Sequence, residues 1–214
     1  MQYDPIKRTL GNFFNQSPFL RKVFYRLLDL LLLRSWHIHL ELRKWIKTAP
    51  SNPKILDAGM GFGQYTYFMA KHIKNADILA VDVKEEQIAD CRNFFKQINY
   101  NNVKFQIADL TKYTTAPQYD LVLCVDVMEH ILEDVIVFKN YVASMNKGGM
   151  LLISTPSDQG GSDVHDDGES SFIEEHVRDG YNIKEIENKL LEAGFSKVEA
   201  RYSYGNPGKI AWRL

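Results

Sequence analysis

The chain has 214 residues, of which 45% are apolar, 25% are charged and 12% are aromatic. This composition supports one domain with a buried core, and it excludes a disordered, collagen-like or coiled-coil chain. The net charge of −1 does not indicate an affinity of the whole chain for nucleic acid. The two cysteines, Cys91 and Cys124, are too few for a disulfide framework or a Cys-based zinc site, and they predict reduced thiols in a cytoplasmic protein.

The N-terminal part of the chain differs from the rest in charge. Residues 1–47 contain nine Lys/Arg and three Asp/Glu, whereas residues 48–214 contain 17 Lys/Arg and 24 Asp/Glu. Residues 17–47 show apolar helical faces bordered by basic residues, although Trp36–Leu42 also alternates as a strand would. The Pro-bearing stretch Ala49–Pro53 separates a helical cap segment, 1–49, from a second domain, 50–214. Three interpretations of residues 17–47 stay open: a cap over the second domain, a peripheral membrane contact and a dimer contact.

After this boundary, short apolar runs alternate with helical periods, which indicates βαβ units and a mostly parallel sheet. The predicted strands are Lys54–Ala58, Ile78–Val81, a half-exposed edge strand from Val103 to Ile107, Leu121–Val125, Met150–Ile153, Lys197–Tyr202 and Lys209–Arg213. The helical spacing is clearest from Ile131 to Met145, and Asn182 and Gly194 have the residue types of a helix start and stop. No apolar run approaches the ~20 residues that a membrane span needs.

The most informative segment is ILDAGMGFG at 55–63, in which an apolar strand leads into Asp-x-Gly-x-Gly-x-Gly and then into a helix. Glycines let a backbone turn tightly and approach a ligand, and the first turn of a helix presents free N–H groups. Asp82 ends the second strand, where a doubly wound fold places an acid that binds ribose hydroxyls. Asp109 ends the third strand, where a carboxylate can accept a hydrogen bond from an adenine amino group.

Two classes of cofactor are compatible with a glycine loop of this kind. A dinucleotide needs G-x-G-x-x-G against its pyrophosphate, whereas this loop has G-x-G-x-G directly after Asp57. An acid beside a pyrophosphate is repulsive, but an acid beside an ammonium group is attractive. S-adenosylmethionine carries an ammonium group, a ribose and an adenine without any phosphate, so the pattern favours it.

Over roughly residues 50–205 the chain resembles the class I S-adenosylmethionine-dependent methyltransferases. The resemblance is carried by five segments in the order and spacing of that family: ILDAGMGFG (55–63), ILAVDV (78–83), VKFQIADL (103–110), YDLVLCVDVMEHI (119–131) and NKGGMLLISTP (146–156). It implies a Rossmann-like, doubly wound α/β fold with a seven-stranded, mostly parallel sheet of order 3-2-1-4-5-7-6. The cofactor would be S-adenosylmethionine and the product S-adenosylhomocysteine.

The resemblance also implies roles for individual residues. The methionine part of the cofactor would lie against Gly59, Gly61 and Gly63, with Asp57 at its ammonium group and Asp126 at its end beside the substrate. Asp82 would bind the ribose. The adenine would be framed by Val83, Ala108, Asp109 and Leu110. The segment Val-Met-Glu-His at 127–130 is similar to small-molecule methyltransferases, including the O-methyltransferases of quinone biosynthesis. The segments typical of DNA-methylating and catechol-type metal-dependent enzymes are absent from the sequence.

Transfer to a hydroxyl group needs a base, and His130 and His176 are the candidates because histidine titrates near neutral pH. The acidic loop from Ser157 to Tyr181 lies where the family builds its acceptor site, so His176, Arg178 and Tyr181 are expected to face the acceptor. No metal ion is predicted, and a site at His165, Asp166 and Asp167 remains the weaker alternative to a solvated loop.

The leading hypothesis is methyl transfer to an oxygen of a small or lipid-like molecule. N-methylation of protein or RNA and a non-catalytic S-adenosylmethionine-binding module are the two alternatives. The predicted partner is a small-molecule or lipid-like acceptor, nucleic acid is disfavoured, and the predicted location is the cytoplasm, with peripheral membrane contact through residues 17–47 left open.

Overall fold

The computed structural model describes residues 17–159, 177–178 and 180–203. The chain divides into two compact units, residues 1–108 and residues 109–214. The five described strands have the order β3-β2-β1-β4-β5, and the strand pairs inside each unit are parallel.

The first unit alternates helices with three parallel strands. Its elements are α2 (Pro18–Leu31), α3 (Leu33–Ile46), β1 (Lys54–Ala58), α4 (Gln64–His72), β2 (Asp77–Asp82), α5 (Glu85–Gln97) and β3 (Val103–Ile107). β1 pairs with β2 and β2 with β3, so that Ile55 lies opposite Ile78 and Ile78 opposite Val103. Ile55, Leu56 and Ile78 are fully buried, as expected for strands covered on both faces.

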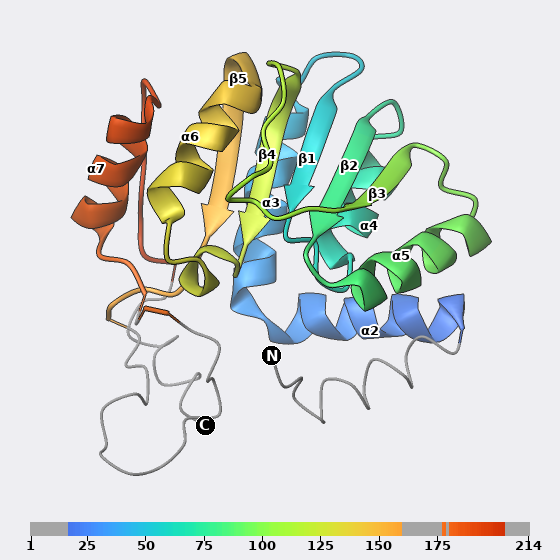
Figure 1. The fold of residues 1–214 in the computed structure, drawn as a ribbon. Helices are drawn as coiled ribbons and strands as arrows, with labels where there is room; N and C mark the ends of the chain where they lie inside the picture. Colours follow the sequence, from blue (N-terminus) through green and yellow to red (C-terminus); the bar gives the residue numbers. More distant parts are fainter. Residues whose placement is uncertain (1–16, 160–176, 179, 204–214) are drawn as a thin grey trace. The chain divides into compact units, whose positions relative to one another are not determined.

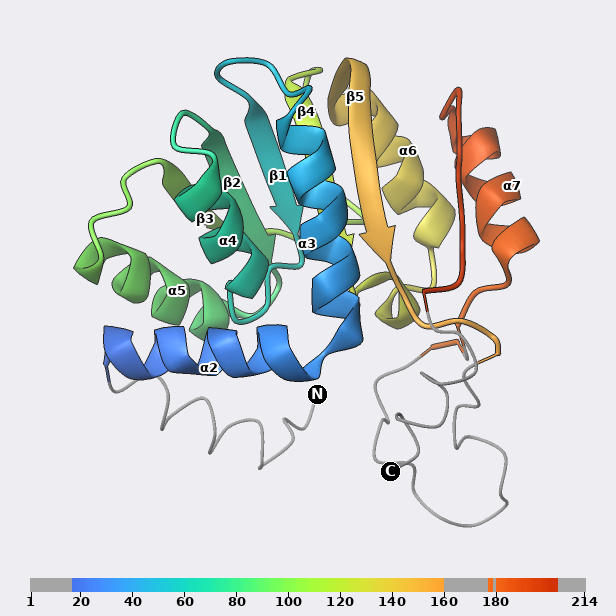
Figure 2. The ribbon, with the colours of Figure 1, turned by 180° about the vertical axis from the view of Figure 1, so that it is seen from behind.

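The two N-terminal helices belong to this first unit. α2 begins where the Ser17 hydroxyl accepts a hydrogen bond from the Leu20 N–H at 3.2 Å, with Pro18 as its first residue. Figure 1 shows α2 running across the end of the unit toward which β1 and β2 point, and Figure 2 shows α3 and α4 in front of the strands. The segment Trp36–Leu42, which also alternates as a strand would, is helical in α3.

The second unit pairs two strands and flanks them with helices. Its elements are β4 (Tyr119–Val125), the short 3-10 helix η1 (Met128–His130), α6 (Asp134–Ser144), β5 (Met145–Ser154) and α7 (Ile183–Ala193). β4 and β5 are parallel, with Leu121 opposite Met150 and a register shift before it. The side chain of Asn182 caps α7 by accepting from Lys184 N–H, and Gly194 ends it in a left-handed conformation.

The predicted α/β architecture with a parallel sheet is confirmed, but not every predicted element forms. The helical period from Ile131 does not continue through Met145, because Met145 has extended backbone and starts β5. The strand predicted over Lys197–Tyr202 was wrong: these residues have no neighbouring strand in the described part of the chain, and the Ala200 N–H donates to Glu187 instead. The strand predicted over Lys209–Arg213 lies outside the described residues, so the full order 3-2-1-4-5-7-6 stays a prediction.

Among residues 17–159, 177–178 and 180–203, no helix combines the length and the hydropathy that crossing a membrane requires. The same residues contain no group of three or more His, Cys, Asp or Glu placed to hold a metal ion. His165, Asp166 and Asp167 lie outside the described residues.

Candidate functional site

The glycine loop connects β1 to α4 through a series of left-handed backbone turns. Gly59, Gly61 and Gly63 have φ angles of 78°, 52° and 75°, a conformation that other residues rarely adopt. A Cβ on Gly61 would meet nothing within 4 Å, whereas a Cβ on Gly63 would lie 2.9 Å from the sulfur of Cys91. Gly63 is therefore required by packing, and Gly61 borders open space in which a ligand would fit.

Asp57 lies near the carboxyl end of β1 and is 3% exposed. The hydroxyl of Thr66, in α4, donates a hydrogen bond of 2.5 Å to its Oδ2 atom. Burial, supported by the nearby charge of Asp82, raises the pKa of Asp57 to about 7 despite this hydrogen bond. An ionised carboxylate in this position is destabilised until a cation approaches, so the site suits the ammonium group of the proposed cofactor.

The raised pKa of Asp57 leads to a pH prediction. Between its ordinary value of 3.8 and about 7, the folded protein retains a proton that the unfolded chain has released, so the free energy of unfolding falls as pH rises through this range. The Asp57→Asn variant should lose this dependence, whose slope approaches about 1.4 kcal/mol per pH unit for one proton. Urea denaturation at several pH values measures it.

Ligand affinity should depend on the same ionisation, but it should rise with pH where the free energy of unfolding falls. The affinity for S-adenosylhomocysteine, which keeps the ammonium group, should rise between pH 6 and pH 8 as Asp57 ionises at about 7. Asp57→Asn should bind more weakly and lose this rise. A wild-type affinity that is flat over this range would mean that Asp57 does not face the ammonium group.

Asp82 holds the loop from the end of β2. Its Oδ2 atom accepts the N–H of Gly61 at 3.0 Å, and its Oδ1 atom accepts the N–H of Lys84 at 2.9 Å. A carboxylate offers about four acceptor positions, so both oxygens keep capacity for the hydroxyls of a ribose. The acid predicted to bind ribose therefore lies directly against the glycine loop.

The residues predicted to frame an adenine occupy the ends of β2 and β3. In the first unit, Val83 is 55% exposed and the Ala108 N–H donates to the carbonyl of Asp82 at 3.0 Å. In the second unit, Leu110 is buried and Asp109 closes a turn by accepting from the N–H and the hydroxyl of Thr111. These hydrogen bonds lower the pKa of Asp109, so its carboxylate is ionised at neutral pH.

Two residues of the predicted site follow β4 in the second unit. Asp126 has a φ of 52°, and it is one of only two non-glycine residues with a positive φ in the described part of the chain. Such strain is found preferentially at functional positions. His130 ends η1 with its side chain 33% exposed, and its Nε2 atom lies 4.0 Å from the carboxylate of the buried Glu129. His130 is thus exposed enough to meet a substrate.

A family model described as a methyltransferase domain matches residues 50–194, which begin after α3 and include every site residue described above. The chain belongs to the methyltransferase domain family. The resemblance predicted from the sequence is thereby confirmed.

The names of the curated relatives of this chain differ in the atom that receives the methyl group. The (S)-coclaurine N-methyltransferase of Papaver somniferum is 26% identical over 148 residues, covering 69% of this chain and 39% of its own length. The ubiquinone biosynthesis O-methyltransferase of Acinetobacter baumannii is 31% identical over 104 residues, covering 48% of this chain and 43% of its own length. The chain thus spans about two fifths of these relatives.

Solved structures share the fold of this chain. The phosphoethanolamine N-methyltransferase 2 of Haemonchus contortus, in complex with S-adenosyl-L-methionine, has a TM-score of 0.65 at 18% identity, covering 87% of this chain and 44% of that one. The YcgJ protein of Bacillus subtilis has a TM-score of 0.60 at 16% identity, and the match covers 72% of this chain and 68% of that one. These identities support the Rossmann-like fold and nothing finer.

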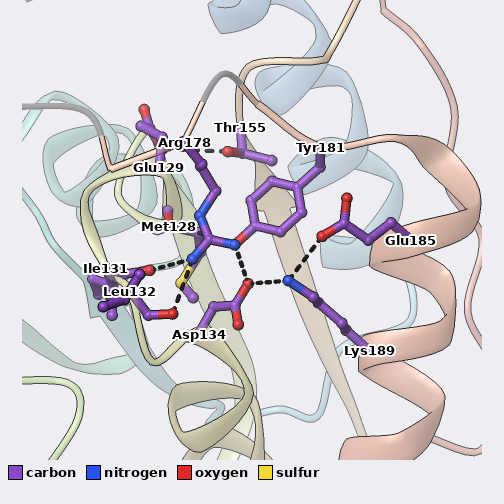
Figure 3. A network of polar contacts seen from close by, with 10 residues as sticks. All are labelled: Met128, Glu129, Ile131, Leu132, Asp134, Thr155, Arg178, Tyr181, Glu185 and Lys189. Carbon is purple, nitrogen blue, oxygen red and sulfur yellow. Dashed lines mark hydrogen bonds and ion pairs between the residues drawn. The ribbon is translucent and has the colours of Figure 1, made fainter.

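Arg178 and Tyr181, which the sequence predicted to face the acceptor, lie in a partly buried polar network of the second unit (Figure 3). Asp134, at the start of α6, accepts hydrogen bonds from Arg178, from the Tyr181 hydroxyl at 2.7 Å and from Lys189 at 2.8 Å. Arg178 also donates to the carbonyls of Ile131 and Leu132 at 2.6 and 3.1 Å. These contacts tie the residues before α7 to the start of α6, and the acceptor roles of Arg178 and Tyr181 stay predictions.

The network sets the protonation states of its members. Burial alone would raise the pKa of Asp134, but the hydrogen bonds of Lys189 and Tyr181 and the charge of Arg178 outweigh it and lower the pKa. Burial and the Asp134 carboxylate raise the pKa of Tyr181, so its hydroxyl remains a donor. Stability from Asp134 is therefore present above its unfolded pKa and lost as pH falls below it.

Replacing Asp134 should destabilise the fold. Asp134→Asn leaves Arg178 and Lys189 facing a neutral group, and the free energy of unfolding should fall by about 3 kcal/mol. Glu185→Gln is the matched control, because Glu185 pairs with the same Lys189 at 2.8 Å from an exposed position. It should cost less than about 0.5 kcal/mol. Equal losses in the two variants would show that the network contributes little.

One predicted site residue lies outside the described part of the chain, and three residues near the glycine loop were not predicted from the sequence. His176 lies outside the described residues, so its predicted role stays a prediction. The sequence analysis missed Thr66, which bonds Asp57, and the pair Arg21 and Tyr25, which are 3% and 1% exposed. Arg21 and Tyr25 could have been noticed because they are four residues apart, which places both polar side chains on one face of a helix that is otherwise largely apolar.

Proposed function

We propose that the chain is a cytoplasmic, S-adenosylmethionine-dependent methyltransferase that transfers a methyl group to an oxygen of a small or lipid-like molecule. One observation carries the choice of cofactor. The buried Asp57, whose pKa is raised to about 7, lies beside a glycine loop that is open at Gly61 and held by Asp82. This set suits an ammonium group and a ribose, and it would repel a pyrophosphate.

The chain's own residues then have distinct tasks. The cofactor supplies an activated methyl group and its leaving group. Asp57 binds the ammonium group, and Asp82 binds the ribose while it holds Gly61 in place. Val83, Ala108, Asp109 and Leu110 frame the adenine, and Asp126 lies beside the methionine end. The protein contributes alignment of the acceptor, which can supply a large part of the acceleration.

For a hydroxyl acceptor, His130 would remove the proton. Its position at the end of η1, with the side chain 33% exposed, favours this role, because a general base must lie within reach of the acceptor hydroxyl. Arg178 and Tyr181 would act indirectly, by fixing through Asp134 the segment that bears the acceptor loop. The role of His176 in acceptor binding remains part of the proposal.

The decisive test uses labelled S-adenosylmethionine with matched phenols and amines of one carbon skeleton. The proposal expects label in the phenol, with a rate in His130→Gln that falls by about 100-fold or more, as loss of a general base predicts. Label only in the amine would favour N-methylation, which the match to the coclaurine relative over 69% of this chain makes the second candidate. Label in neither would favour a non-catalytic binding module.

We further propose that the outward face of α2 contacts a membrane surface, which would bring a lipid-like acceptor to the site. Phe19, Leu30 and Leu31 are 73%, 65% and 72% exposed, and the basic residues Lys22 and Arg26 lie beside Phe19 and Leu30 at helical spacing. Exposed apolar residues bordered by cations are typical of helices that lie in the interface of anionic bilayers.

Flotation with phosphatidylglycerol vesicles at low salt tests the membrane contact. The wild-type chain should float, and a Phe19→Ser/Leu30→Ser variant should remain at the bottom of the gradient. Flotation with phosphatidylcholine vesicles should be weaker, because the basic residues would have no anionic partner. A wild-type chain that fails to float with anionic vesicles would end the membrane proposal without affecting the cofactor assignment.

A further inference from the structure

The inward face of α2 carries two buried polar side chains directed at the glycine loop. Arg21 and Tyr25 are one helical turn apart and are 3% and 1% exposed. Burying a guanidinium group and a hydroxyl is costly unless both find hydrogen bonds. Their partners lie mainly in the loop between β1 and α4 and in α5.

Both side chains converge on one carbonyl oxygen of the loop. Arg21 Nη2 donates to the carbonyl of Phe62 at 2.9 Å, and the Tyr25 hydroxyl donates to the same oxygen at 2.6 Å. The Tyr25 hydroxyl in turn accepts from Arg21 Nε at 2.8 Å, which orients it as a donor toward the loop. Burial raises the pKa of Tyr25 and keeps this hydroxyl protonated.

The neighbouring parts of the loop are held as well. Arg21 Nη1 donates to the carbonyl of Asp90 in α5 at 3.2 Å, and the sulfur of Cys91 lies 3.7 Å from the carbonyl of Gly61. A peptide group is planar, so the N–H of Gly63 points away from the Phe62 carbonyl, and it donates to Met60 at 2.9 Å. Rotating the peptide between Phe62 and Gly63 would therefore break three hydrogen bonds at once.

The loop is thus held from two directions. Asp82 binds the N–H of Gly61, while Arg21 and Tyr25 bind the carbonyl of the next residue. We propose that Arg21 and Tyr25 are positioning residues, which hold the glycine loop in its ligand-binding conformation and so link the docking of α2 to cofactor binding. Linkage of this kind is reciprocal, so the bound cofactor must stabilise the docked α2 to the same extent.

The inference rests on the proposed use of S-adenosylmethionine, and it does not depend on the methyl acceptor. Tyr25→Phe removes one hydroxyl and keeps the ring that packs on Tyr67 at 5.4 Å between centroids. Tyr67→Phe is the matched control, because it removes one hydroxyl from the same aromatic cluster and keeps the backbone N–H of residue 67, which donates to the carbonyl of Gly63 at 2.9 Å. Differential scanning calorimetry of both variants separates a loss of folding from a loss of positioning.

Two readouts decide the proposal. Tyr25→Phe should raise the Kd for S-adenosylhomocysteine about five- to tenfold, the size of one hydrogen bond, while Tyr67→Phe changes it less than about twofold. Without ligand, the amides of Gly61 and Gly63 should exchange with solvent faster in Tyr25→Phe than in Tyr67→Phe. In the wild-type chain, S-adenosylhomocysteine should slow amide exchange in α2.

A third variant tests the shape of the donor. Arg21→Lys keeps the charge and loses the planar fork that reaches Phe62, Tyr25 and Asp90, so it should also weaken binding. Equal amide exchange of the loop in Tyr25→Phe and Tyr67→Phe, with unchanged affinity, would overturn the proposal and leave Tyr25 a packing residue. Failure of the wild-type chain to bind S-adenosylhomocysteine would instead contradict the proposed cofactor, because the exchange comparison is made without ligand.

Discussion

Gly61→Val should raise the Kd for S-adenosylhomocysteine by at least about 100-fold, because its side chain would project into the space that the ligand occupies. A Cβ at this position meets nothing within 4 Å, so the first side-chain atom has no neighbour in the protein to clash with. Its cost to folding comes from the backbone, whose φ of 52° is unfavourable for a β-branched residue. This strain should lower the free energy of unfolding by about 1–3 kcal/mol, and isothermal titration calorimetry on the folded variant measures binding.

The chain provides a control with the same strain elsewhere. Gly148 in β5 has a φ of 82°, and a Cβ there also meets nothing within 4 Å. Gly148→Val should lose a similar amount of stability and keep its affinity for S-adenosylhomocysteine. Gly63→Ala should behave in a third way, because its Cβ would lie 2.9 Å from the sulfur of Cys91 and would disturb packing. Unchanged affinity in Gly61→Val would refute the assignment of the loop.

Asp82→Ala is expected to have the second largest effect on binding. The substitution removes the acceptor of the Gly61 N–H at 3.0 Å, and it removes the carboxylate proposed to bind the ribose. Each hydrogen bond to a charged acceptor contributes about 1.5–3 kcal/mol, which corresponds to a rise in Kd of roughly 10- to 150-fold. The measurement is again a calorimetric titration with S-adenosylhomocysteine.

Asp77→Ala is the control for a carboxylate on the same strand. Asp77 begins β2 at the opposite end and pairs with Lys104 at 3.4 Å on the surface, where such pairs contribute little. Its affinity for S-adenosylhomocysteine should equal that of the wild-type chain. If Asp82→Ala weakened binding by less than about twofold, Asp82 would serve only to hold the loop and Lys84, and another group would bind the ribose.

The parts of the fold that could be predicted depend on residues that are close together in the sequence. The run from Ile55 to Gly63 contains the strand, the acid and the glycines of the loop in one segment, and the structure places them as expected. Asn182 and Gly194 likewise mark the two ends of α7. The strand predicted over Lys197–Tyr202 does not form within the described residues, because a strand needs a paired backbone as well as a suitable local sequence.

The interactions that escaped prediction join residues far apart in the sequence. Arg21 reaches Phe62 across 41 positions, and Arg178 reaches Asp134 across 44. A single sequence gives no signal for such pairs, since their meeting depends on how the chain is folded. The contacts of Arg178 with Asp134, Ile131 and Leu132 illustrate this, and its predicted acceptor role stays a prediction.

We propose that the glycine loop of this chain binds S-adenosylmethionine through Asp57 and Asp82. The most direct test of this proposal is a calorimetric titration of the purified wild-type chain with S-adenosylhomocysteine, with NAD as the competing ligand class. We predict one-to-one binding in the micromolar range for S-adenosylhomocysteine and no heat change with NAD. Binding of NAD, or the absence of S-adenosylhomocysteine binding by the folded chain, would contradict the account.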